Sequence, residues 1–99
     1  MFKTKKIEIT INANIKSDFY FVDIKNNQLL TKTKTYPITN EEIAELLLIV
    51  KDWKDNYTKT NIIDSEEFIL KIDNNVLHGK GDYPPNYDAF KKWLGDFCD

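Results

Sequence analysis

The stretch that decides the fold is Ile72–Phe97, IDNNVLHGKGDYPPNYDAFKKWLGDF. Its order predicts the end of a strand, a tight turn, a second strand, a loop with Gly and Pro, and a closing helix. The same order occurs earlier, where Ile24–Asn27 (IKNN) matches Ile72–Asn75 (IDNN) and Tyr36-Pro37 matches Tyr83-Pro84. Either the chain contains two degenerate hairpin-plus-helix units around one core, or two ordinary units look alike by chance. Two units are too few for a solenoid.

Composition limits the classes of function. The 99 residues are enough for a single domain, 1–99, with 41% hydrophobic and 30% charged residues. The net charge is −2, and all 14 basic residues are lysine. A chain of this charge has no overall field that attracts nucleic acid or an anionic membrane. Without arginine, mechanisms that need a bidentate guanidinium are excluded.

The ends of the chain favour a cytoplasmic protein. Cys98 is the single cysteine, so an internal disulfide is impossible and a reducing compartment is the simplest interpretation. The N-terminus begins MFKTKKIEITI, which alternates instead of running apolar as a signal peptide does. No apolar run approaches the roughly 20 residues of a membrane span, so we expect no membrane partner.

The first third of the chain predicts three strands. Residues 5–15 alternate isoleucine or alanine with polar residues, which is typical of a strand with one dry face. Residues 19–25 are rich in aromatic and β-branched types, and Asn26-Asn27 suits a hairpin turn. A third strand is expected over 28–36. Its TKTKT run is polar on both faces, which is typical of a protected edge.

A helix is expected next. Thr39 with Glu42 three residues later forms the capping-box pattern, and Ile38 with Ile43 forms a hydrophobic staple across it. The apolar periodicity predicts that the helix runs to about Asn56. A connector over 58–63 then precedes the second half.

The second half predicts two strands, over 66–72 and 76–80, and a last helix capped by Asn86. The order is therefore βββαββα. Short connections make neighbouring strands antiparallel, and amphipathic helices must bury their apolar faces on the sheet. We expect an α+β fold: one mostly antiparallel five-stranded sheet with two helices packed on one face.

The C-terminal part resembles a group of small bacterial proteins from AT-rich genomes. Their pattern is D-G-x-x-W-x-L, followed by G-x-x-x-P-x-N and an aromatic residue. Here the pattern begins at Asp64 and continues through Leu70 to the G-x-Y-P-P-N-Y segment, with Ser65 for the glycine and Phe68 for the tryptophan. The resemblance covers the last third to half of the chain. It implies the fold and assigns no function or site.

The sequence contains few residues of the types that act in catalysis or bind metals. His78 is the single histidine, and no cysteine or second histidine has ligand-type spacing to it. Gly79-Lys80-Gly81-Asp82 lacks the P-loop pattern, because Tyr83 and two prolines separate the lysine from the helix. The acidic pairs Glu41/Glu42 and Glu66/Glu67 are adjacent in sequence and do not form a facing carboxylate pair. We therefore predict no catalytic, metal-binding or cofactor-binding residues, and a protein that is not an enzyme.

Two binding functions remain. The leading prediction is an adaptor or inhibitor that binds another protein, as phage- or plasmid-encoded inhibitors of bacterial defence systems do at this size. The alternative is a single-stranded nucleic-acid-binding module that uses the open sheet face. Lysines on an edge beside Tyr20 and Tyr36 would support that alternative, but the acidic total makes nucleic acid unlikely. These lysines are Lys3, Lys5, Lys6, Lys32 and Lys34.

Four residues are predicted to contact the protein partner: Thr33, Tyr36, Tyr83 and Tyr87. Thr33 and Tyr36 lie on the expected edge strand, where a partner could add a strand. Tyr83 and Tyr87 flank the Pro-Pro loop as aromatic anchors, unless they pack against the last helix instead. The sequence leaves three surfaces open: the edge strand, this loop and the open sheet face. The oligomeric state is expected to be a monomer or a weak homodimer.

Overall fold

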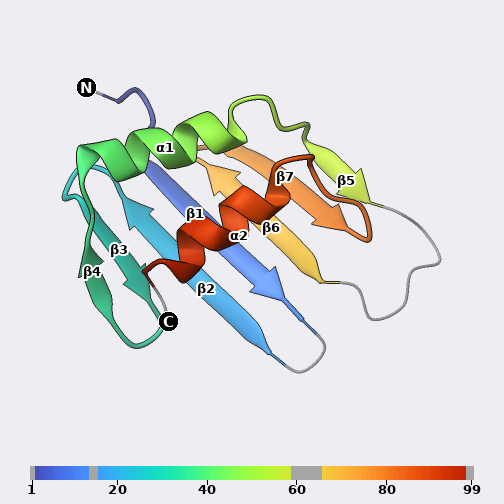
Figure 1. Cartoon of the computed structure of the whole chain (residues 1–99), viewed down its shortest axis with the longest axis horizontal. Helices are drawn as coiled ribbons and strands as arrows, with labels where there is room; N and C mark the ends of the chain where they lie inside the picture. Colours follow the sequence, from blue (N-terminus) through green and yellow to red (C-terminus); the bar gives the residue numbers. More distant parts are fainter. Residues whose placement is uncertain (1, 14–15, 59–65, 98–99) are drawn as a thin grey trace.

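The computed structural model describes residues 2–13, 16–58 and 66–97. These residues form one sheet and two helices, which confirms the α+β class (Figure 1). The strands are β1 Lys6–Asn12, β2 Ser17–Asp23, β3 Gln28–Thr31, β4 Thr35–Pro37, β5 Asn56–Thr58, β6 Glu67–Ile72 and β7 Asn75–Lys80. The helices are α1 Asn40–Val50 and α2 Tyr87–Gly95.

The sheet has seven strands in the order β4-β3-β2-β1-β6-β7-β5, so the prediction of five strands is wrong in detail. The expected strand over 28–36 is a hairpin of β3 and β4, because residues 32–34 turn the chain back on itself. The expected helix end and connector contain β5, which pairs parallel with β7 and makes the sheet mixed. All the other pairings are antiparallel.

The two faces of the sheet follow from the alternation of side chains along each strand. Ile7, Ile9 and Ile11 of β1 are buried, and their partners on β6 are Ile72, Leu70 and Phe68. Both helices lie over this face (Figure 1). Their buried side chains join those of the strands in one hydrophobic core. The prediction that two helices share one face is therefore confirmed, and no helix of the described residues lies over the opposite face.

Helix α1 begins as the sequence predicts. The Thr39 hydroxyl accepts a hydrogen bond from the Glu42 N–H at 3.1 Å, and the Glu42 carboxylate accepts one from the Thr39 N–H at 2.8 Å. The capping box is therefore confirmed. The helix ends at Val50 instead of about Asn56, because Asn56–Thr58 pair with β7. Its buried face consists of Ile43, Leu46 and Val50.

The turn between β6 and β7 is centred on Asp73 and Asn74, one residue before the predicted Asn74-Asn75 pair. Asp73 adopts a positive φ of 53°, and its carboxylate accepts hydrogen bonds from the backbone of Lys5 and Lys6. Packing requires glycine at position 79, because a Cβ there would collide with the ring of Phe68 on the paired strand. These two positions fix how β6 and β7 meet the core.

Candidate functional site

Tyr83 and Tyr87 lie in a packed aromatic cluster. Their rings stack with centroids 4.7 Å apart, and both contact the ring of Phe68. The Tyr83 hydroxyl donates to the backbone carbonyl of Glu66 at 2.5 Å, and the Tyr87 hydroxyl donates to the Glu66 carboxylate at 2.6 Å. Tyr87 is buried and Tyr83 is half-buried. The structure thus places this pair as packing for the loop and α2, which was the alternative that the sequence left open.

The polar centre of this cluster is the Glu66 carboxylate. Burial would raise the pKa of Glu66, but hydrogen bonds from Lys91 and Tyr87 and the Lys91 charge outweigh it and lower the pKa. Burial and the neighbouring Glu66 raise the pKa of Tyr87 well above its ordinary value, so this hydroxyl stays protonated. The pairing with Lys91, at 2.6 Å, ties the start of β6 to α2.

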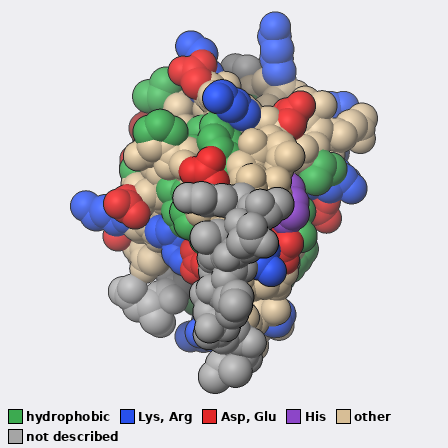
Figure 2. Space-filling view, turned by 90° about the vertical axis from the view of Figure 1, so that its right-hand side faces the viewer, with side chains coloured by type: hydrophobic (Ala, Val, Ile, Leu, Met, Phe, Trp, Pro, Cys, Tyr) green, Lys and Arg blue, Asp and Glu red, His purple; other side chains and the backbone are tan. Residues whose placement is uncertain are grey.

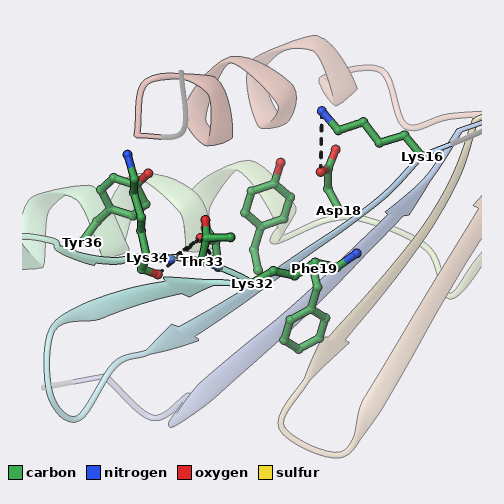
Figure 3. A pocket seen from close by; sticks show the side chains of 9 residues that line it. Lys16, Asp18, Phe19, Lys32, Thr33, Lys34 and Tyr36 are labelled. Carbon is green, nitrogen blue, oxygen red and sulfur yellow. Dashed lines mark hydrogen bonds and ion pairs between the residues drawn. The ribbon is translucent and has the colours of Figure 1, made fainter.

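Thr33 and Tyr36 lie elsewhere, in a pocket of about 330 Å³ at the β2–β3–β4 corner of the sheet (Figure 3). Thr33 belongs to the turn between β3 and β4 and not to a strand. Figure 3 shows Thr33, Lys34 and Tyr36 pointing to the helix side of the sheet, while Phe19 points to the opposite side. The full lining is Lys16, Asp18, Phe19, Tyr20, Thr31, Lys32, Thr33, Lys34 and Tyr36.

The predicted basic edge divides into two separate groups. Lys32 and Lys34 line the pocket at the β3–β4 turn, together with Tyr20 and Tyr36. Lys3, Lys5 and Lys6 surround a second hollow with Asp73 and Asn74, at the other end of the strands. This separation arises because β1 and the β3–β4 hairpin lie two strands apart and Lys6 pairs with the far end of β2.

The open face of the sheet carries an apolar band that the sequence analysis did not single out. Cross-strand pairing places these side chains in two neighbouring rows, one through Val76, Lys71, Glu8, Phe21 and Leu30, and one through His78, Ile69, Thr10 and Phe19. Phe19 is 37% exposed and Val76 is 52% exposed. The sequence contains a sign of this band in the FYFVD segment of β2. Three consecutive aromatic residues there place aromatic side chains on both faces of the sheet.

His78 lies beside this band. Its Nε2 atom is 2.6 Å from the Glu67 carboxylate, which also accepts a hydrogen bond from the Asn12 amide at 3.0 Å. The Asn12 and His78 hydrogen bonds lower the pKa of Glu67. In the described part of the chain, no hydroxyl or thiol hydrogen-bonds to the His78 ring. The arrangement is thus a surface hydrogen-bonded pair without the nucleophile that covalent catalysis needs.

The described residues offer neither a metal-binding cluster nor a membrane-spanning helix. Within residues 2–13, 16–58 and 66–97, no three His, Cys, Asp or Glu side chains gather as metal ligands would. None of the helices in these ranges has the length and apolar character required to cross a membrane.

Comparison of the chain with protein-family models, curated proteins and solved structures found no match. The interpretation of function therefore depends on the geometry of this chain.

Proposed function

We propose that this protein acts without catalysis, by binding another protein on the open face of its sheet. The observation that carries the proposal is the apolar band on the face opposite α1 and α2. Exposed apolar side chains interspersed with polar and charged ones, as in these rows, are typical of the surface that non-obligate protein partners bind. The band consists of Phe19 and Phe21 on β2, Leu30 on β3, Ile69 on β6 and Val76 on β7.

The charges on this face favour a protein partner over a polyanion. Lys6, Lys71 and Lys80 share the face with the carboxylates of Glu8, Asp23 and Glu67, so the charges of the two signs balance. Lys71 and Glu8 lie 3.8 Å apart and partly neutralise each other. Figure 2 shows the same mixture of acidic and basic side chains around the β5 side of the molecule. Nucleic acid would require an excess of cations along its path.

The size of the face also supports a protein partner. The two longest extents of the molecule are 41 and 28 Å, and the sheet lies across this plane (Figure 1). A stable interface buries roughly 800 Å² of each partner, which a face of this size can supply. The sheet edges offer a smaller binding surface than the open face. Strands β4 and β5 are each three residues long, so few backbone groups are available for strand addition.

The test compares two exposed apolar residues on opposite sides of the molecule. Val76 is 52% exposed on the open face, and Leu48 is 72% exposed on α1. Tagged wild type, Val76→Glu and Leu48→Glu are used to capture partners from host lysate, and the captured protein is then titrated in purified form. We expect Val76→Glu to weaken binding at least tenfold and Leu48→Glu to leave it within about twofold.

Circular dichroism of each variant confirms that the fold is kept. Equal binding by wild type and Val76→Glu, or loss of binding in Leu48→Glu alone, would show that the open face is not the docking surface. An adaptor and an inhibitor are then distinguished by whether the purified partner loses its own activity in the complex.

A further inference from the structure

The pocket at the β2–β3–β4 corner is basic, as is the hollow around Lys3, Lys5 and Lys6, but only this pocket also has aromatic walls. Three lysines line it, Lys16, Lys32 and Lys34, against the single carboxylate of Asp18. The whole chain has a net charge of −2, so the charge of this lining is opposite in sign to that of the chain. Asp18 neutralises only part of it, because its ion pair with Lys16 is 3.9 Å long, with the Lys16 side chain 74% and the Asp18 side chain 41% exposed.

The turn that carries two of these lysines is held in a defined shape. The Thr31 hydroxyl accepts hydrogen bonds from the Lys34 N–H at 3.1 Å and the Thr33 N–H at 3.4 Å. The Thr31 N–H donates to the Lys34 carbonyl at 2.8 Å, and the Lys32 ammonium donates to the Ser17 carbonyl at 2.7 Å. The cations are therefore presented on a fixed loop, which reduces the entropy lost when a ligand binds.

The walls of the pocket are aromatic. Tyr20 and Tyr36 both line it, and both pack on the hydrophobic core, which fixes their rings. Aromatic rings beside cations are the combination that holds nucleotides, because the ring stacks on the base and the cations contact the phosphate. A volume of about 330 Å³ lies at the low end of small-ligand pockets. It suits one nucleotide and not a duplex.

We propose that this pocket binds a nucleoside phosphate, either a free mononucleotide or the 5′-terminal nucleotide of a single strand. Lysine binds phosphate as a point charge and needs no guanidinium fork, which agrees with a chain that has no arginine. The Lys34 ammonium contacts the phosphate, and the Tyr36 ring stacks on the base. The Thr33 hydroxyl, which is in the same turn as Lys34, donates to a phosphate oxygen. Phe19 belongs both to this lining and to the open face, whereas Thr33, Lys34 and Tyr36 point to the helix side, so the proposed contacts do not use the open-face band.

The experiment follows amide chemical shifts of isotope-labelled protein during titration with thymidine 5′-monophosphate, thymidine, inorganic phosphate and a 5′-phosphorylated thymidine hexamer. We expect the monophosphate to shift the amides of residues 31–36 and thymidine to bind at least tenfold more weakly. Lys34→Gln should weaken binding at least about fivefold, since it removes one contacting charge. Asp18→Asn should strengthen it, because it removes the single carboxylate of the lining.

Lys25→Gln is the matched control, because Lys25 is exposed in the turn at the other end of β2. It should leave the affinity unchanged. A hexamer that binds as tightly as the monophosphate identifies a single-nucleotide site, whereas one that binds at least tenfold more tightly identifies a strand end. The proposal is overturned if no phosphate compound shifts residues 31–36 at millimolar concentration, or if Lys25→Gln weakens binding as much as Lys34→Gln.

Discussion

The two faces of the sheet use the same strands for different purposes. On β1, Ile7, Ile9 and Ile11 are buried under the helices, while Glu8 and Thr10 between them face the open side. On β6, Phe68 is fully buried and its neighbour Ile69 is half-buried on the open side. The helix-covered face therefore contains most of the buried apolar side chains, whereas the apolar side chains of the open face remain partly exposed.

The largest effect is expected from matched phenylalanine substitutions on the two faces. Phe68 is 0% exposed and contacts the rings of four aromatic residues, so Phe68→Ala should cost about 3–5 kcal/mol of unfolding free energy. Phe19 is 37% exposed, so Phe19→Ala should cost about 1 kcal/mol or less. Urea denaturation measures both. Similar losses in the two variants would mean that the open face is also part of the stabilising core.

A smaller effect is expected where α1 joins the helix-covered face. Thr39→Ala removes the hydroxyl that accepts from the Glu42 N–H, and it should lower the unfolding free energy by about 1 kcal/mol. Thr39→Ser keeps the acceptor and serves as the control. Denaturation midpoints that coincide for wild type and Thr39→Ala would show that the capping box contributes nothing to the stability of the fold.

The smallest expected effect is on the pH dependence of stability. It compares Glu66, which contacts α2 on the helix side, with Glu67, which faces the open side. The pKa values of Glu66 and Glu67 both lie below the ordinary value of 4.5, so each carboxylate stabilises the fold above that pH. This stabilisation should be lost as the pH falls through 4.5 toward the lowered values. Glu66→Gln and Glu67→Gln should each flatten the fall in melting temperature between pH 5 and pH 3. A fall that is equally steep in the double variant would assign the acid sensitivity to other groups.

Local patterns in the sequence predicted most of the fold. The capping box at Thr39 and the alternation of β1 each depend on neighbours within a few residues. The turn after β2 was placed correctly, but it spans four residues, 24–27, and not Asn26-Asn27 alone. The helices on one face follow from the same periodicities. Strands β4 and β5 were not predicted, since three residues are too few to show a period. β5 also depends on pairing with β7, about 20 residues further along the chain.

The candidate site was predictable only where its residues are close in sequence. Thr33 and Tyr36 lie together because one turn joins them, and Tyr20 joins them through the pairing of β2 with β3. The burial of Tyr87 depends on Glu66, which is distant in sequence and has no local signature. The apolar band on the open face was equally hidden, because its members come from four strands and meet only through the register of the sheet.

The central claim is that the open sheet face receives a protein partner. It is tested most directly by photo-crosslinking with p-benzoylphenylalanine, placed at Val76 on the open face in one variant and at Leu48 on α1 in the other. Both positions are exposed enough to accept the larger side chain without disturbing the core. After illumination in host lysate, we expect a specific adduct from position 76 and none from position 48. An adduct from position 48, with none from position 76, would contradict the claim and place the partner on the helix side.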